Sequence, residues 1–373
     1  MKRLGPSKLI FFALVLAALA LAAASAAAAE NWPTFRGNQQ RTGGIAPPAP
    51  SSSDISGQIV WQRSVPGAIQ SSPAISGGRI FFGSNDGNLY AITEAEGNLL
   101  WRFGTDNWVS SSPAVGGGLV IFGSYDGKVY AVDAANGALK WQFTAHNIVA
   151  SSPAIADGRV YFGSVDGYVY CVDIKTGWQK WNYKAGREVY GSPSVADGVV
   201  YIGNHDGKLM ALDAASGKLK WRAIVGGPVT TAPAISGGYL YFGSWDGKLY
   251  CADIKNQAVI WRHDSGGSIE SSPLVANGKV YFGNLRGKMT ALDAKSGSVA
   301  WRAETGQTIM SSPSIRRNQI FFGNNLNEIH CLDANTGASI WKISTGGFVV
   351  TAPAAGRDAI YVAGMDNIIR CVR

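Results

Sequence analysis

Short apolar runs, each closed by a glycine-containing turn, follow one another along most of the chain. In the stretch between residues 109 and 143 the pattern predicts four strands, over 109–115, 119–124, 128–132 and 138–143. Tyr125-Asp126-Gly127 joins the second strand to the third, because an Asp-Gly pair tolerates the positive φ of a tight hairpin. Runs such as Ile80-Phe81-Phe82 are continuous rather than alternating. They indicate strands that are covered on both faces.

The pattern repeats every 40 residues, with no insertion or deletion between units. One position of the repeat is always tryptophan: Trp61, Trp101, Trp141, Trp181, Trp221, Trp261, Trp301 and Trp341. Another is always proline: Pro73, Pro113, Pro153, Pro193, Pro233, Pro273, Pro313 and Pro353. Four antiparallel strands in such a unit form one propeller blade. The sequence therefore predicts an all-β, eight-bladed β-propeller.

The ends of the series predict how the ring closes. Trp61 lies on a fourth strand that no first, second or third strand precedes, whereas the last unit has three strands and no tryptophan. We expect residues 57–65 to pair with the C-terminal strands and complete the last blade, which removes two exposed sheet edges. The expected organisation is a signal peptide over 1–29, an N-terminal arm over 30–56 that lies across the propeller, and the propeller over 57–373.

One segment of the unit carries a family resemblance. It follows the order A-x-D-x-x-T-G-x-x-x-W, for example at Ala131, Asp133, Asn136, Gly137 and Trp141. The units resemble the PQQ-binding-like propeller repeat, and the arm sequence Trp32-Pro33-Thr34-Phe35-Arg36-Gly37-Asn38 is similar to the segment that often precedes such repeats. The resemblance implies the fold and a structural role for all eight tryptophans in docking neighbouring blades. Function does not follow, because one fold hosts many tasks.

Residues 1–29 have the order of a secretory signal. Lys2, Arg3 and Lys8 precede an apolar run from Leu9, which ends in consecutive alanines. We expect cleavage just before Glu30, no membrane span after it, and a periplasmic, secreted or cell-surface protein. The alternative is that the apolar run of 21 residues stays as a membrane anchor.

The charge balance excludes one class of partner. Without the three cations of the signal, 30 Lys and Arg remain against 25 Asp and Glu, which gives a net charge of +5 rather than +8. The chain has no cluster of Lys and Arg of the kind that a nucleic-acid groove needs. The expected partners are other envelope or secreted proteins, and the expected state is a monomer.

Candidate chemistry is sparse. Quinone-dependent dehydrogenases resemble this chain in their repeats, but they are longer, with insertions that build a calcium and quinone site and typically a pair of adjacent cysteines. Here the units follow one another without insertion, and neither Cys-Cys nor Cys-x-x-Cys-His occurs. We therefore expect no cofactor, no metal site and no catalytic residue.

Cysteine and histidine also favour structural interpretations. The cysteines share one repeat position, and equivalent positions of packed sheets lie about 10 Å apart, beyond the Cα separation of about 7 Å that a disulfide spans. We expect no disulfides and four free, buried thiols, at Cys171, Cys251, Cys331 and Cys371. The histidines have no spacing suited to a metal site or a catalytic triad, and we expect isolated surface or turn residues at His146, His205, His263 and His330.

Function is expected where the repeat varies. One variable position precedes the turn Asp and another precedes the Ser-Ser-Pro segment, and in a propeller both loops emerge on one face. The two sets should share a rim around the channel mouth, where aromatic residues and Met are typical of an interaction surface. The alternative is drift of exposed turns. The candidate face comprises Tyr125, His205, Trp245, Met365, Trp108, Tyr190, Arg187, Glu270 and Phe348.

Three functions remain open. The first is a non-catalytic exported scaffold that binds another protein, or a peptide added to an exposed strand. Within the family its nearest likeness is the BamB-type outer-membrane assembly subunit, from which it differs because no lipid-anchoring Cys follows the apolar run. The second is a small-molecule or glycan-binding propeller with Tyr125, Tyr190 and Trp245 as stacking platforms. The third, least favoured, is a PQQ-dependent dehydrogenase.

Overall fold

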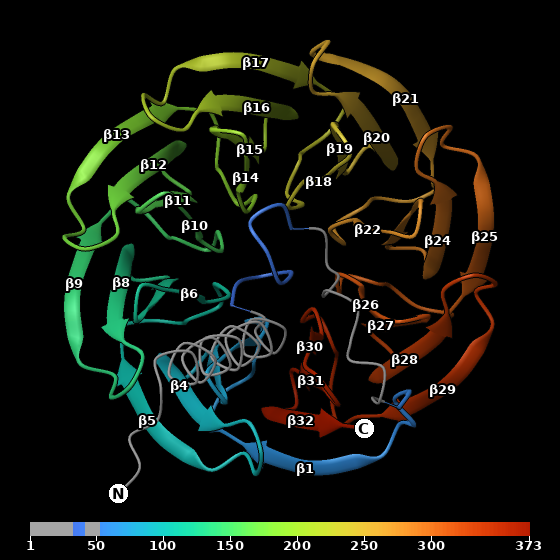
Figure 1. Ribbon diagram of the computed structural model, residues 1–373, viewed down its shortest axis with the longest axis horizontal. Helices are drawn as coiled ribbons and strands as arrows, with labels where there is room; N and C mark the ends of the chain where they lie inside the picture. The colour runs from blue at the N-terminus through green and yellow to red at the C-terminus, as the bar shows by residue number, and fades with distance from the viewer. Residues whose placement is uncertain (1–32, 42–52) are drawn as a thin grey trace, which may run out of the picture.

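A computed structural model of the chain describes residues 33–41 and 53–373. These residues form eight four-stranded antiparallel sheets, arranged as blades around a central channel (Figure 1). The predicted eight-bladed propeller is thus confirmed. The expected signal peptide and residues 30–32 and 42–52 of the expected arm lie outside the described residues.

Four strand positions recur in every blade. The innermost strands are β2 (Ala74–Ser76), β6 (Ala114–Gly116), β10 (Ala154–Ala156), β14 (Ser194–Ala196), β18 (Ala234–Ser236), β22 (Leu274–Ala276), β26 (Ser314–Arg316) and β30 (Ala354–Ala355). The second strands are β3 (Arg79–Gly83), β7 (Leu119–Gly123), β11 (Arg159–Gly163), β15 (Val199–Gly203), β19 (Tyr239–Gly243), β23 (Lys279–Gly283), β27 (Gln319–Gly323) and β31 (Ile360–Ala363).

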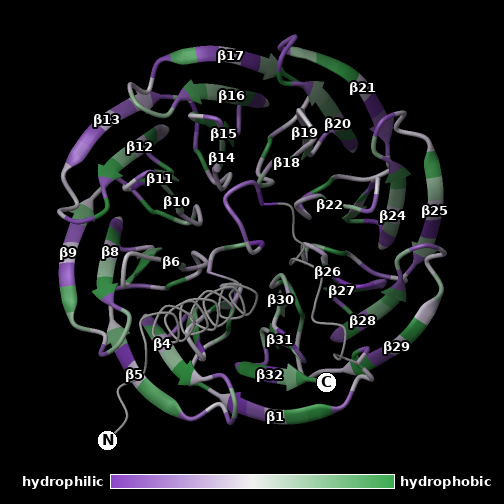
Figure 2. Ribbon diagram, in the orientation of Figure 1, coloured by the Kyte–Doolittle hydropathy of each residue, from purple (hydrophilic) through white to green (hydrophobic). Residues whose placement is uncertain are grey.

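The third strands are β4 (Asn88–Thr93), β8 (Lys128–Asp133), β12 (Tyr168–Asp173), β16 (Lys208–Asp213), β20 (Lys248–Asp253), β24 (Lys288–Asp293), β28 (Glu328–Asp333) and β32 (Ile368–Val372). The outermost strands are β5 (Leu99–Gly104), β9 (Leu139–Thr144), β13 (Gln179–Lys184), β17 (Leu219–Ile224), β21 (Ala258–Asp264), β25 (Val299–Glu304), β29 (Ser339–Ser344) and β1 (Ile59–Ser64). Figure 2 shows hydrophilic stretches along the outermost strands, which face solvent.

The innermost strand is shorter than the predicted 109–115. In the second blade it begins only at Ala114, because Pro113 has no N–H and the serines before it bond to the next blade. Ser112 donates its backbone N–H to the Ser152 hydroxyl at 3.0 Å, and the Ser111 hydroxyl donates to the Ser151 carbonyl at 3.0 Å. The Ser-Ser-Pro segments therefore connect blades around the channel and do not extend a sheet.

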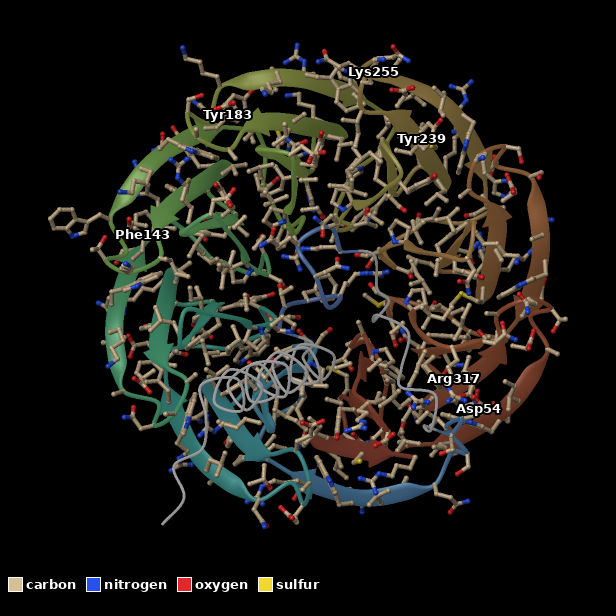
Figure 3. All side chains as sticks on the ribbon, in the orientation of Figure 1. Asp54, Phe143, Tyr183, Tyr239, Lys255 and Arg317 are labelled. Carbon is tan, nitrogen blue, oxygen red and sulfur yellow. The ribbon has the colours of Figure 1, made fainter. Side chains whose placement is uncertain are left out.

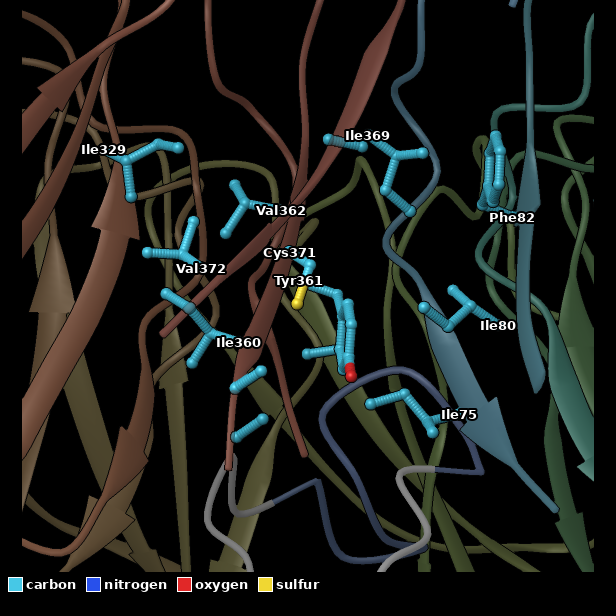
Figure 4. Packing of buried hydrophobic residues seen from close by; sticks show 14 of the residues in the cluster. Ile75, Ile80, Phe82, Ile329, Ile360, Tyr361, Val362, Ile369, Cys371 and Val372 are labelled. Carbon is cyan, nitrogen blue, oxygen red and sulfur yellow. The ribbon is translucent and has the colours of Figure 1, made fainter. Parts of the chain in front are cut away.

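The core lies between the faces of neighbouring blades. In Figure 4, Tyr361 and Cys371 of the last blade lie toward Ile75 and Ile80 of the first, while Ile360 lies on the opposite face of the last blade. All five side chains are at most 3% exposed. Burial on both faces explains why the apolar runs are continuous along the second and third strands.

The repeated tryptophans lie at the blade interfaces. Trp101 packs on Gly137 of the next blade, whose φ is +74°, and a Cβ on that glycine would lie 2.7 Å from the indole. The Trp101 indole N–H donates to the Ala134 carbonyl at 3.3 Å. Equivalent indole hydrogen bonds to the following blade are made by Trp61, Trp141, Trp181, Trp301 and Trp341.

Strand β1 closes the ring as predicted. It pairs antiparallel with β32, in a sheet ordered β1-β32-β31-β30. The Arg373 N–H donates to the Gln58 carbonyl at 2.8 Å, as the Asp133 N–H donates to the Ala138 carbonyl at 2.8 Å in the second blade. The two ends of the propeller thus reproduce the turn that leads to the outermost strand in an uninterrupted blade.

Residues just before β1 strengthen this closure. The Ile55 carbonyl accepts the Trp341 indole N–H at 2.7 Å and the Gln319 amide at 2.9 Å, while the Ile55 N–H donates to the Gln319 side chain at 2.8 Å. Asp54 forms an ion pair with Arg317 at 3.5 Å (Figure 3). The segment expected to be the end of a separate arm therefore takes part in the blade interface.

The cysteines and one histidine are buried. All four thiols are free and at most 1% exposed, and burial raises the pKa of each, to about 11 for Cys371. The prediction that every histidine is a surface or turn residue is wrong for His330, which lies on β28 and is only 7% exposed. Its ring stacks on Phe322 with centroids 5.1 Å apart, and Nε2 lies 3.1 Å from the Glu328 carboxylate.

Candidate functional site

The central channel is lined by a ring of serine hydroxyls. Each accepts the backbone N–H of the equivalent residue in the preceding blade, as the Ser112 hydroxyl does from Ser72 at 2.9 Å. The ring continues across the chain ends, where the Ala352 N–H donates to the Ser72 hydroxyl at 2.9 Å, and is interrupted at Ala232 and Ala352, which have no hydroxyl. These bonds fix the residues just before each Ser-Ser-Pro segment, which form the channel mouth.

Residues 33–41 lie inside the ring of blades, in the central channel (Figure 1). The carbonyls of Pro33, Gln39 and Gln40 accept backbone N–H groups of β6, β14 and β18, at 2.6, 3.0 and 3.0 Å. All three donors are the middle residues of innermost strands, which run away from the mouth. The described part of the arm therefore enters the channel, where we expected it to lie across the propeller.

Two arginines hold this segment in place. Arg36 and Arg41 are at most 1% exposed. Arg41 donates to the carbonyls of Pro193 at 2.5 Å, of Ser152 at 3.0 Å and of Pro153 at 2.9 Å, and Arg36 donates to the Ser272 carbonyl. Burial lowers the pKa of both guanidinium groups to about 9, and the charge of Arg41 adds to the effect on Arg36.

The channel is hollow between this segment and the mouth. An inner cavity of ≈ 180 Å³ has Phe35 among its lining residues, and a wider cavity of ≈ 560 Å³ lies at the mouth. The two are continuous, since both are lined by Gln70, Thr230, Glu270, Met310 and Val350. The result is a well that opens on the face where the repeat varies.

Backbone hydrogen bonds place the two variable sets side by side. In blade after blade, the residue before the turn Asp donates its N–H to a carbonyl in the loop that enters the blade. Tyr125 donates to Trp108 at 2.9 Å, and Met365 donates to Phe348 at 2.8 Å. His205 and Trp245 make the same bond, to Glu188 and Pro228. These bonds place six of the nine candidate residues on one rim, and Tyr190, Arg187 and Glu270 join them through the His205 ring, the Glu188 carboxylate and the mouth cavity, respectively.

Aromatic rings form two groups on this rim. Trp108 and Tyr125 have ring centroids 5.7 Å apart. In the second group, His205 lies 4.9 Å from Tyr190 and 5.5 Å from Trp245. Burial lowers the pKa of His205 although Glu188 opposes this, so its ring is neutral at pH 7 and packs as an aromatic group.

The exposed fractions identify which rings reach solvent. Trp108 is 47% exposed, Trp245 40% and Phe348 48%. The Trp245 indole N–H donates to the Thr230 hydroxyl at 3.0 Å, which fixes that ring over the mouth. Large exposed aromatic residues that are held in place and gathered around a cavity are typical of binding surfaces.

The opposite part of the mouth is largely apolar, with two amides, Gln70 and Asn325, and one carboxylate. Met310, Phe348, Val350 and Met365 line it together with Glu270. Burial raises the pKa of Glu270. Within residues 33–41 and 53–373 this carboxylate has no hydrogen-bond or ion-pair partner. Met310 was visible in the sequence as a variable position, whereas nothing in the sequence indicated that Phe35 lines the channel.

The donor set does not fit a calcium and quinone centre. The turn aspartates are already bonded, since Asp126 accepts the Lys128 N–H at 2.9 Å and the Tyr130 hydroxyl at 2.6 Å. In the part of the chain that the structure describes, no three His, Cys, Asp or Glu side chains gather as metal ligands would. The described residues likewise include no helix that is long and apolar enough to cross a membrane.

The amino-acid sequence matches the model of a known protein family. The family model described as "Outer membrane protein assembly factor BamB" matches residues 51–261, 222–325 and 286–372. No curated protein matches the sequence.

Solved structures are similar in fold at low sequence identity. BamB from Moraxella catarrhalis is 18% identical, with a TM-score of 0.75 over 85% of this chain and 99% of that one. The computationally designed Ika8 protein is 19% identical, with a TM-score of 0.77 over 85% and 99%. Quinohemoprotein alcohol dehydrogenase from Comamonas testosteroni is 14% identical, with a TM-score of 0.81 over 94% and 81%.

Proposed function

The chain belongs to the family described as outer membrane protein assembly factor BamB, and on that premise we propose that it is a non-catalytic scaffold of the cell envelope. Its loop face binds another protein at the channel mouth. One observation carries this proposal. Trp108, Trp245 and Phe348 are between 40% and 48% exposed on the rim around the well. Burying such rings against a partner is favourable, because apolar area leaves water.

Envelope localisation is part of the same proposal. The basic, apolar and alanine-rich order of residues 1–29 supports export, and the family description is that of an outer membrane assembly factor. No cysteine stands at the end of the apolar run, where a lipid would be attached. Its task is therefore proposed as protein binding in the envelope, with no particular assembly machine assigned.

The mouth offers little for catalysis. General acid–base chemistry needs at least one group that is poised to exchange a proton with a second group or with a nucleophile. Glu270 is the only titratable side chain among the described residues that line the two cavities. A single carboxylate among apolar, amide and hydroxyl groups suits recognition better than reaction.

Site-specific photo-crosslinking tests the proposal. A photoreactive phenylalanine replaces Trp108 or Phe348 on the rim, and Trp178 in the matched control. Trp178 is 77% exposed in the turn between β12 and β13, which emerges on the other face. We expect the two rim positions to capture the same envelope protein and position 178 to miss it.

A paired substitution completes this test. Trp245→Ala combined with Tyr190→Ala should abolish the capture from the rim, because it removes two of the three rings in one group. Capture that survives the pair unchanged would place the binding face elsewhere. Capture that is lost when soluble oligosaccharide is added, with no protein crosslinked, would favour the glycan-binding alternative.

A further inference from the structure

Glu270 differs from every equivalent residue in the other blades. The position before the Ser-Ser-Pro segment is uncharged in the seven other units: Gln70, Ser110, Ala150, Tyr190, Thr230, Met310 and Val350. Glu270 lines both the mouth cavity and the inner cavity. Among the described lining residues of these two cavities it is the only charged one. The well therefore has a single negative group at the level where it narrows.

The backbone around Glu270 is fixed by its neighbours. Ile269 is fully buried and donates its N–H to the Ser244 carbonyl at 3.1 Å. The Ser268 hydroxyl donates to the Trp245 carbonyl at 2.8 Å, and the Ser268 carbonyl accepts the Leu285 N–H at 2.9 Å. The loop that carries the carboxylate is thus bonded to the turns of two blades, so it cannot turn away from the well without breaking these bonds.

An unpaired carboxylate in such a place is unfavourable by itself. Glu270 is half-buried, and removing part of the water around a charge costs free energy that a counter-charge or hydrogen bonds can return. The pKa of Glu270 agrees with this cost, because burial raises it above its usual value. A cation that enters the well would regain the lost interaction most fully, because its hydrogen bonds to a carboxylate are stronger than those of neutral donors, and an anion would be repelled.

The walls suit the rest of a basic side chain. Met310, Val350 and Met365 present apolar groups beside Glu270, and the methylene stem of Lys or Arg packs well on such a surface while its charged head reaches an anion. The nearby Trp245 and Tyr190 rings can add cation–π attraction as the side chain passes the rim.

We propose that the protein segment bound at the mouth carries a lysine or arginine flanked by apolar residues, and that Glu270 receives this basic side chain. This rests on the proposed function, because it assumes that the occupant of the mouth is a protein. Glu270 is then the residue that sets specificity, while the aromatic rim supplies apolar contact area. The arrangement selects a basic group because no cation of the described lining competes for the carboxylate.

Peptide selection on the purified, signal-free protein tests the inference. A library of random 12-residue peptides is selected on the wild type, and peptides that also bind the Trp245→Ala, Tyr190→Ala pair are discarded. We expect the remaining peptides to share a Lys or Arg beside apolar residues. Fluorescence polarisation then measures the dissociation constant of one such peptide.

Matched variants separate the carboxylate from its surroundings. Glu270→Gln should weaken binding about tenfold or more, which corresponds to one charge-assisted hydrogen bond. Replacing the basic residue of the peptide with norleucine should cost the same, and combining both changes should add little. Glu304→Gln on β25 is the control, since that side chain is 72% exposed on an outermost strand; it should bind as the wild type does.

The outcomes distinguish the two proposals. Peptides that need the aromatic pair but share no basic residue, or that bind Glu270→Gln as tightly as the wild type, overturn the inference and leave the scaffold function standing. If no peptide depends on the aromatic pair, both fail. Circular dichroism of each variant confirms that a loss of binding is not a loss of folding.

Discussion

Two isoleucines near the ring closure differ strongly in burial. Ile55 precedes β1 and is 2% exposed, in a hydrophobic cluster that the last blade shares with both of its neighbours. Ile59 begins β1 and is 41% exposed. Changing each to Ala removes the same atoms from the same short segment, and only the burial differs. The hydrogen bonds of Ile55 use its backbone and persist in the variant.

Burial sets the expected magnitudes. Truncating a buried isoleucine to Ala loses its transfer free energy and leaves a cavity, and typically costs about 2–5 kcal/mol. We expect about 3 kcal/mol for Ile55→Ala, since its neighbours Ile360 and Val372 are held by β31 and β32 and cannot collapse far. Ile59→Ala should cost less than about 1 kcal/mol, as for most exposed strand positions.

Urea denaturation followed by tryptophan fluorescence measures both values. The midpoint should fall clearly for Ile55→Ala and hardly for Ile59→Ala, with the denaturant dependence of the free energy of unfolding unchanged. Equal effects of the two substitutions would refute the reasoning, because they would mean that residues 53–58 contribute nothing to the blade interface. The ring would then be closed by the β1–β32 pairing alone.

Three further predictions address the closure, the thiols and pH. Deleting residues 54–65 should abolish cooperative thermal unfolding, whereas a circular permutant that joins Arg373 directly to Asp54 should keep it; an unchanged transition in the deletion contradicts the closure. Ellman's reagent should detect no thiol in the native protein and four after denaturation, because all cysteines are buried and free; a count of zero after denaturation would indicate disulfides. Burial lowers the pKa of His330, so the unfolded chain binds a proton more readily and stability falls as pH drops below about 6.5. His330→Phe should flatten this loss between about pH 7 and 5, and parallel profiles of the two proteins would rule the histidine out.

Much of the fold was predictable because its signals are local. Each Asp-Gly pair specifies a hairpin. The tryptophan always lies on the outermost strand and the proline always precedes the innermost strand, so the blade can be predicted from a single unit. The start of the innermost strand was not predictable from one unit, because Ser112 bonds to Ser152 of the next blade. That interaction exists only once the ring has formed.

The rim of the site was predictable from the sequence, and the cavity behind it was not. Variation within the repeat located the rim, since loops at one face of a propeller are free to differ. The well needed the structure, because the hydrogen bonds of Arg41 join it to residues more than 100 positions away. His330 was misassigned because its burial depends on stacking against Phe322 across two strands of one blade.

Residues 33–41, which form a plug in the channel, have a consequence for the stoichiometry of binding. Eight nearly equivalent blades alone would offer an incoming chain eight equivalent orientations. The plug instead bonds unequally to individual blades, and Glu270 marks one sector, so the rotational degeneracy of the ring is broken. Complexes with this propeller should therefore contain one bound segment, in one angular setting, and exchange between segments should require the first to depart.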